Sequence, residues 1–100
     1  MLHTVNKSPL DRNTLESAIK HAIKGSAILM IEDGIYGAMK STIKSDMVTN
    51  ARDDIIFYVM GPDLKARGIP EDKLIEGVKI IDYNGFVDLA AEHDVVQSWL

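Results

Sequence analysis

Ser8 and His3 are the closest this chain comes to a hydrolytic nucleophile with its base. Ser8 precedes Pro9 and lacks the Gly-x-Ser-x-Gly pattern that exposes the serine of many hydrolases. His3 lies in an apolar, strand-like opening, where an imidazole is more often a hydrogen-bonded core group than a base. We therefore favour a turn role for Ser8 and a structural role for His3, with a hydrolase as the weaker alternative.

Two adjacent carboxylates, Glu32 and Asp33, follow an apolar run and could position a metal ion or share a proton. Neighbouring residues point in different directions, however, and an aspartate here is well suited to capping a helix that follows. We favour capping for Asp33. His21 and His93 are isolated, and neither has a second histidine at metal-ligand spacing, so we expect no metal site and no cofactor.

Three cationic side chains, Lys7, Lys65 and Arg67, could gather around an anion such as a phosphate. Lys65 and Arg67 would also interact favourably with the dipole at the end of a short helix, which is the interpretation we favour. Neither the Gly-x-x-x-x-Gly-Lys pattern nor the Gly-x-Gly-x-x-Gly pattern of phosphate-binding loops is present. Because the three cations could bind an anion without these patterns, a small anion- or nucleotide-binding domain remains the alternative function.

Cysteine is absent from the 100 residues, which excludes a disulfide scaffold and a zinc site built from thiolates. Fifteen acidic residues against eleven Lys and Arg give a net charge of −4, without the basic stripe typical of proteins that bind nucleic acid directly. We find neither a signal-peptide pattern nor an apolar run near the roughly 18 residues of a membrane span. These features predict a cytoplasmic protein that contacts neither membrane nor nucleic acid.

The composition is that of a folded chain, with 46% hydrophobic and 26% charged residues. We expect a single domain over residues 1–100. Apolar runs predict strands at 1–6, 27–31, 55–60 and 78–81, with a fifth at an edge over 95–99. The run at 27–31 lacks polar alternation, as expected of a parallel strand that helices cover on both faces.

Helical patterns separate these runs. A capping box at Asn13–Glu16 starts the first helix, which Gly25 is expected to end. A second helical face runs from Ile35 to Ile43, and a weaker pattern lies between residues 40 and 54. A short helix follows Pro62, and a last one carries residues 86–93.

Alternating strands and helices predict a three-layer α/β/α sandwich, flavodoxin-like, with a mostly parallel sheet of four or five strands. In such folds ligands and partners meet the loops beyond the carboxyl ends of the strands. Those loops are expected at residues 6–10, 32–35, 61–63 and 82–85.

Four blocks in this order resemble the DsrH/TusB family over nearly the full chain: Leu2–Pro9, Glu32–Tyr36, Gly61–Gly68 and Ile81–Val87. The Gly61–Gly68 block and the tail from Glu92 to Trp99 look closer to the DsrH branch of sulfur-oxidising bacteria. The resemblance implies a DsrEFH-like fold and a subunit of a cytoplasmic heterohexamer, with two copies each of three related chains.

Complexes of the TusBCD form relay persulfide sulfur toward 2-thiouridine at the tRNA wobble position, and those of the DsrEFH form pass it to a DsrC-like carrier during sulfur oxidation. The resemblance places the acceptor cysteine on the TusD or DsrE type of subunit. Some DsrH members carry a cysteine on the first helix, but the corresponding stretch Leu15–Ile19 has an alanine there. Because a thiolate must accept the sulfur, this chain is expected to be non-catalytic.

The expected role is that of a structural or docking subunit, with DsrE/TusD-like and DsrF/TusC-like subunits and, through the complex, a DsrC/TusE-like carrier as partners. Lys7, Ser8, Glu32 and Asp33 are expected in loops that face the carrier. The isolated chain is expected to self-associate, because its helices are too few to cover a parallel sheet fully. The residues expected at subunit interfaces are Ile35, Tyr36, Met39, Val95, Val96 and Trp99.

Overall fold

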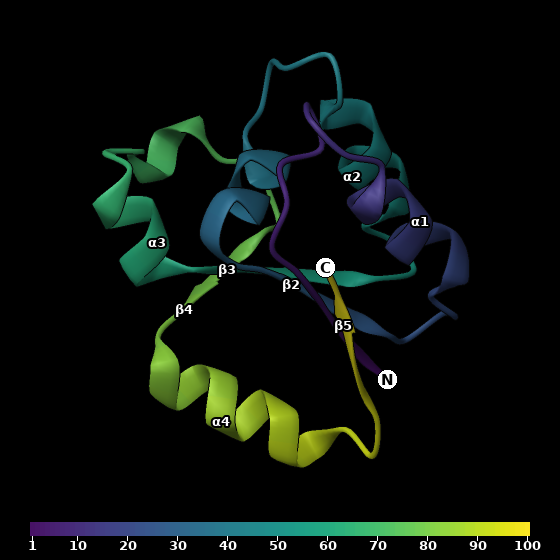
Figure 1. Cartoon of the computed structure of the whole chain (residues 1–100). Helices are drawn as coiled ribbons and strands as arrows, with labels where there is room; N and C mark the ends of the chain where they lie inside the picture. Colours follow the sequence, from purple (N-terminus) through teal and green to yellow (C-terminus); the bar gives the residue numbers. More distant parts are fainter.

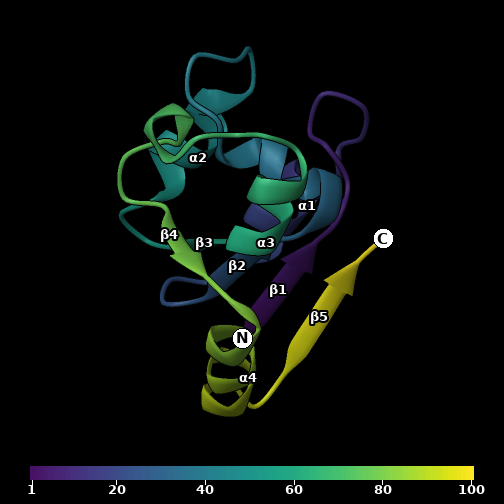
Figure 2. The ribbon, with the colours of Figure 1, turned by 90° about the vertical axis from the view of Figure 1, so that its left-hand side faces the viewer.

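A five-stranded, wholly parallel sheet forms the centre of the molecule, seen here in a computed structural model that describes residues 1–100. The strands lie in the order β4-β3-β2-β1-β5, so the first and last strands of the chain are neighbours (Figure 2). Their bounds are Leu2–Val5 for β1, Ala27–Met30 for β2, Ile56–Met60 for β3, Lys79–Ile81 for β4 and Val96–Trp99 for β5. The predicted α/β fold is confirmed, with five strands.

Helices cover the two faces of the sheet very unequally. The helix α4 lies alone beneath the sheet, and the other helices lie above it (Figure 1). The α-helices are Thr14–His21 for α1, Ser45–Ala51 for α2, Gly61–Ala66 for α3 and Tyr83–Glu92 for α4, and the 3₁₀ helices are Glu32–Ala38 for η1 and Glu71–Lys73 for η2. None of these helices combines the length and the hydrophobicity that crossing a bilayer requires.

The buried side chains follow the same asymmetry. Fourteen buried residues form the main core on the side of α1, α2 and α3, with Leu15, Ile28, Phe57, Val59 and Leu64 among them. Only five form the core on the α4 side: Leu2, Ala27, Leu29, Met60 and Leu89. All four residues of β2 are buried, as its unbroken apolar run predicted.

The first helix differs from its prediction at both ends. Asn13 precedes α1, but its side chain forms no capping hydrogen bond. The helix ends at His21, because Ala22 is already extended, and Gly25 lies three residues further on in the turn before β2, with φ +91°. The Gly25 amide donates to the carbonyl of Asp54 at 2.8 Å. The glycine therefore connects this turn to the segment just before β3 and does not end the helix.

The second helical face, predicted from Ile35 to Ile43, is instead the 3₁₀ helix η1, which starts and ends earlier. Its glycines allow a closer approach to the sheet than an alanine would, since a Cβ on Gly34 would overlap the Val5 carbonyl oxygen. Ile43 lies outside the helix and is 90% exposed. Asp33 lies inside η1 and does not cap it, so the capping interpretation is wrong.

Replacing Gly34 by alanine should destabilise the fold by about 3 kcal/mol or more, because the added Cβ meets main chain that cannot swing aside. Gly25→Ala is the matched control. No atom lies within 4 Å of its added Cβ, so the only cost is that of placing alanine at a positive φ, about 1–2 kcal/mol. Urea denaturation measures both. Equal losses for the two variants would contradict the close approach of η1 to β1.

Candidate functional site

The loops that follow β1, β2 and β3 meet at one edge of the sheet, because parallel strands all end at the same edge. A polar hollow of about 320 Å³ lies there, lined by Lys7, Ser8, Asp11, Arg12 and Asp33. Three of the four residues predicted in carrier-facing loops therefore line one hollow.

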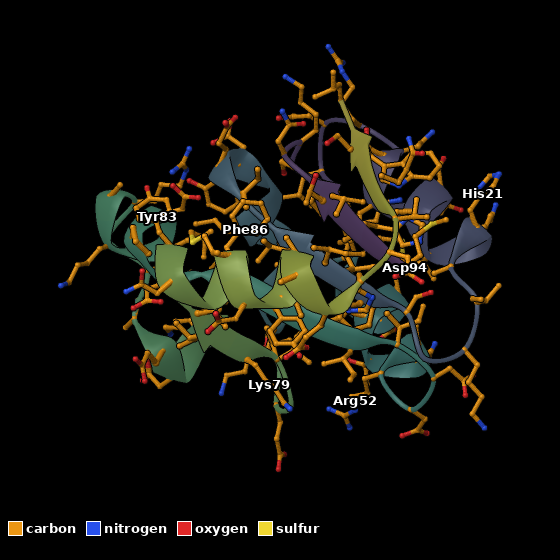
Figure 3. All side chains as sticks on the ribbon, turned by 90° about the horizontal axis from the view of Figure 1, so that it is seen from below. His21, Arg52, Lys79, Tyr83, Phe86 and Asp94 are labelled. Carbon is orange, nitrogen blue, oxygen red and sulfur yellow. The ribbon has the colours of Figure 1, made fainter.

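Glu32, the fourth predicted loop residue, lies elsewhere. It lines a smaller hollow of about 210 Å³ with Ile31, Met60, Asp63, Tyr83 and Phe86. Tyr83 and Phe86 belong to α4, so this hollow opens toward the α4 side of the sheet (Figure 3). The adjacent carboxylates Glu32 and Asp33 thus serve different hollows.

Arg67 interacts with one carboxylate from each hollow, Asp33 and Asp63. Its Nε donates to Asp33 Oδ1 at 3.0 Å, and one terminal nitrogen lies 3.9 Å from Asp63 Oδ1. The other carboxylate oxygen of Asp63 accepts the backbone N–H of Glu32 at 2.8 Å. An arginine between two carboxylates thereby fixes α3 against the start of η1.

The backbone of Glu32 is left-handed, with φ +50°, which is uncommon for a side chain other than glycine or asparagine. The hydrogen bond from its N–H to Asp63 holds this conformation. Sequence reasoning placed Asp63 in a loop at this edge but did not single it out as a site residue, and it missed Asp11 and Arg12. The signal was present for Asp63, since it follows β3 just as Glu32 follows β2, and the loops of adjacent parallel strands meet.

Ser8 and His3 do not form a nucleophile and base. The Ser8 side chain is buried, and its Oγ accepts the Leu10 N–H at 3.2 Å, a turn contact as favoured from sequence. His3 is buried inside β1, where its Nδ1 accepts from the indole Nε1 of Trp99 at 3.0 Å. Burial first, and then the N-terminal ammonium and the neighbouring His21, lower the pKa of His3.

The three cations considered for anion binding are not gathered. Lys7 lines the polar hollow, whereas Lys65 lines a separate hollow of about 640 Å³ beside Pro62 and Ile80. The Arg67 guanidinium is already occupied by carboxylates. Within the polar hollow, Lys7 and Arg12 form no ion pair.

The residues predicted at subunit interfaces are scattered over the fold. Ile35 is fully buried in the main core, so it has no surface to offer another subunit and we remove it from the proposed interface. Tyr36 and Met39 are half-buried in and after η1, at the carboxyl edge. Val95 and Val96 are 49% and 44% exposed at the opposite edge, and Trp99 is half-buried against His3.

No cluster of three or more His, Cys, Asp or Glu side chains is arranged so that it could hold a metal ion. The chemistry available at the carboxyl edge is therefore that of a polar surface with two unpaired cations and one carboxylate network. Such a surface can bind a partner or an anion, but it contains no thiol.

Residues 7–96 match the family described as DsrH like protein. The chain belongs to the DsrH family. Protein TusB of Pectobacterium parmentieri is 33% identical over 100 residues, covering 99% of this chain and all of that protein. Protein TusB of Escherichia coli O1:K1 / APEC is 28% identical over 99 residues, with the same coverage.

Solved structures share the fold of this DsrH-family chain. The ychN protein of E. coli superposes with a TM-score of 0.77 over 97% of both chains at 15% identity. MTH1491 of Methanobacterium thermoautotrophicum, described as a protein of unknown function, gives 0.79 over 97% of this chain and 96% of its own at 16% identity. At these identities the likeness concerns the fold alone.

Replacing Asp63 by alanine should leave the Glu32 N–H without its acceptor and remove one of the two carboxylates beside Arg67, and should destabilise the fold by about 1–2 kcal/mol. Asp63→Asn is the matched control, because its amide oxygen can still accept the Glu32 N–H. Urea denaturation, together with the amide exchange rate of Glu32, measures both effects. Unchanged exchange at Glu32 in the alanine variant would show that Asp63 does not hold this loop.

Proposed function

We propose that this DsrH-family chain is a non-catalytic structural and docking subunit of a cytoplasmic sulfurtransferase complex that relays persulfide sulfur. Its partners are subunits of the TusD/DsrE and TusC/DsrF types, and through them a carrier of the TusE/DsrC type. Membership of the DsrH family over residues 7–96 supports the relay, and the relatives named TusB support it further.

The observation that carries the non-catalytic role is the absence of any thiol. A sulfane sulfur moves between proteins when a thiolate attacks it, and no other side chain here forms a persulfide. The alanine of the first helix, Ala18, is fully buried in the main core. A substitution there would not expose a sulfur acceptor to solvent, so α1 serves packing in this chain.

The docking role rests on the sparsely covered side of the sheet. Figure 3 views this side, where α4 crosses the sheet and the strand region near Arg52 and Lys79 is uncovered. Ile56 of β3, Val87 of α4 and Val96 of β5 are 43%, 64% and 44% exposed. Parallel sheets are normally covered on both faces, so we propose that a companion subunit covers this one. Val95 extends this surface at the start of the last strand.

The carboxyl edge is the proposed meeting place with the carrier. Lys7, Ser8 and Asp33 line its polar hollow, and the Arg67 network fixes the loops around it. The hollow that Glu32 lines opens toward the α4 side, so we propose that Glu32 faces a companion subunit. The unpaired cations Lys7 and Arg12 also favour the second candidate function, binding of a small anion or nucleotide at this hollow.

Of the two pathways that the family serves, tRNA thiolation is the one we propose. The relatives that match over their full length carry the name TusB. The likeness of the Gly61–Gly68 block to the DsrH branch points the other way, toward sulfur oxidation. The chain itself carries no group that distinguishes the two, since the cargo is handled by its companions.

The isolated chain should self-associate at micromolar concentration through its bare sheet face, and Ile56→Asp should shift the equilibrium to monomer by placing a charge in that interface. Ile43→Asp is the matched control, because Ile43 is also an exposed isoleucine but lies in the loop after η1. Sedimentation velocity measures both. A wild-type monomer, or equal disruption by both variants, would contradict a docking role for this face.

A further inference from the structure

A partly buried polar contact joins the two ends of the chain. Trp99, the only tryptophan, lies in the last strand β5, and its indole N–H donates to Nδ1 of His3 in the first strand β1 at 3.0 Å. The strands run side by side in parallel, from Leu2 opposite Val96 to Val5 opposite Trp99 (Figure 2). The indole is also flanked by His21 of α1, with ring centroids 5.4 Å apart.

This contact requires a neutral imidazole. A neutral ring has one nitrogen that donates and one that accepts, so accepting at Nδ1 places the proton on Nε2. Protonation would put a hydrogen on Nδ1 as well, and it would then face the indole N–H. His3 is 2% exposed and its buried Nε2 has no hydrogen-bond partner, so the protein offers nothing that stabilises the charged form.

The surroundings of His3 contain positive charges and no carboxylate partner. The charged groups acting on it are the N-terminal ammonium and His21 of α1. From the strands on either side, the residues in register are Ile28 of β2 and Gln97 of β5, which carry no charge. Burial first, and then these two positive charges, lower the pKa of His3 below the ordinary value of 6.5.

Apart from its backbone pairing with β1, little else holds β5. It is an edge strand, and Val96, Gln97 and Ser98 are exposed. Its other side-chain hydrogen bond to β1 joins Thr4 Oγ1 to Ser98 Oγ at 3.3 Å. The side-chain contacts of the strand therefore centre on Trp99, which bonds to His3 and packs against the main core.

We propose that His3 and Trp99 form a proton-sensitive latch, in which neutral His3 holds β5 on β1 and protonated His3 releases β5. Release uncovers the edge of β1 and removes Val95 and Val96 from the surface proposed above for a companion subunit. The latch is a property of the chain alone and does not depend on the sulfur-relay role.

The direction of the pH dependence follows from the lowered pKa. Between the pKa of folded His3 and 6.5, the unfolded or released state binds more protons than the latched state. The latch is therefore fully stable above about pH 6.5 and weakens as the pH falls from there through the folded-state pKa.

Trp99 fluorescence reports the latch directly, because no other tryptophan contributes. Between about pH 7.5 and about pH 5, the wild-type emission should shift to the red as the indole becomes solvated. His3→Asn keeps an oxygen acceptor near the position of Nδ1 but cannot be protonated, so its emission should not change with pH. His21→Gln removes the neighbouring imidazole that could quench the indole; its emission should still shift to the red, but at a higher pH, because one group that lowers the pKa of His3 is gone.

A wild-type emission that does not move with pH, or a His3→Asn variant that responds like the wild type, would overturn the latch. Should His3→Asn not fold, amide exchange of the wild-type chain decides the question. After correction for intrinsic rates, the opening of β5 should increase about tenfold at the lower pH while β2 stays unchanged. Equal increases in both strands would indicate general loosening and overturn the latch.

Discussion

The parallel direction of all five strands is the constraint on which the rest of the structure depends. It requires a crossover between each strand and the next along the chain, and it brings the loops after β1, β2 and β3 to one edge. It also requires apolar cover on both faces of the sheet. This chain covers one face with most of its helices and the other with α4 alone, so the same constraint that builds the polar edge leaves a sheet face partly bare, and this is the face proposed for a companion.

Under the proposed role, this chain takes no part in the sulfur chemistry itself. The chain has the fold, a polar edge and the network around Arg67, and it contains no thiol. The chain provides three structural features: a fixed edge, a partly bare sheet face, and a last strand linked to the first by His3 and Trp99. These features suit a subunit that positions other chains.

The strands were predictable because their signal is local. The apolar runs around Ile28 and Phe57 are too continuous for surface helices, and the structure places both residues in strands with their side chains buried. The 3₁₀ helix η1 was not predictable, because its form depends on how closely Gly34 approaches the carbonyl of Val5, a contact between distant segments. Helical periodicity alone extended the second helix to Ile43, beyond its true end.

The candidate site was predictable only in part, for the same reason. The principle that loops gather beyond the carboxyl ends of parallel strands placed Lys7, Ser8 and Asp33 together, as the structure does. It did not identify Asp63 as the acceptor for the Glu32 N–H, because that requires knowing that β2 and β3 are neighbours. Nor could it show that Ile35 points inward, since an apolar residue on a short helix suits either core or interface.

The most direct measurement is the intact mass of each subunit after the chain has been purified with a cysteine-bearing companion of the TusD/DsrE type and loaded by a persulfide donor. The account predicts that this chain co-purifies in the assembly with an unchanged mass, while the companion gains sulfur. Sulfane sulfur on this chain, or failure of the chain to join the assembly, would contradict the account.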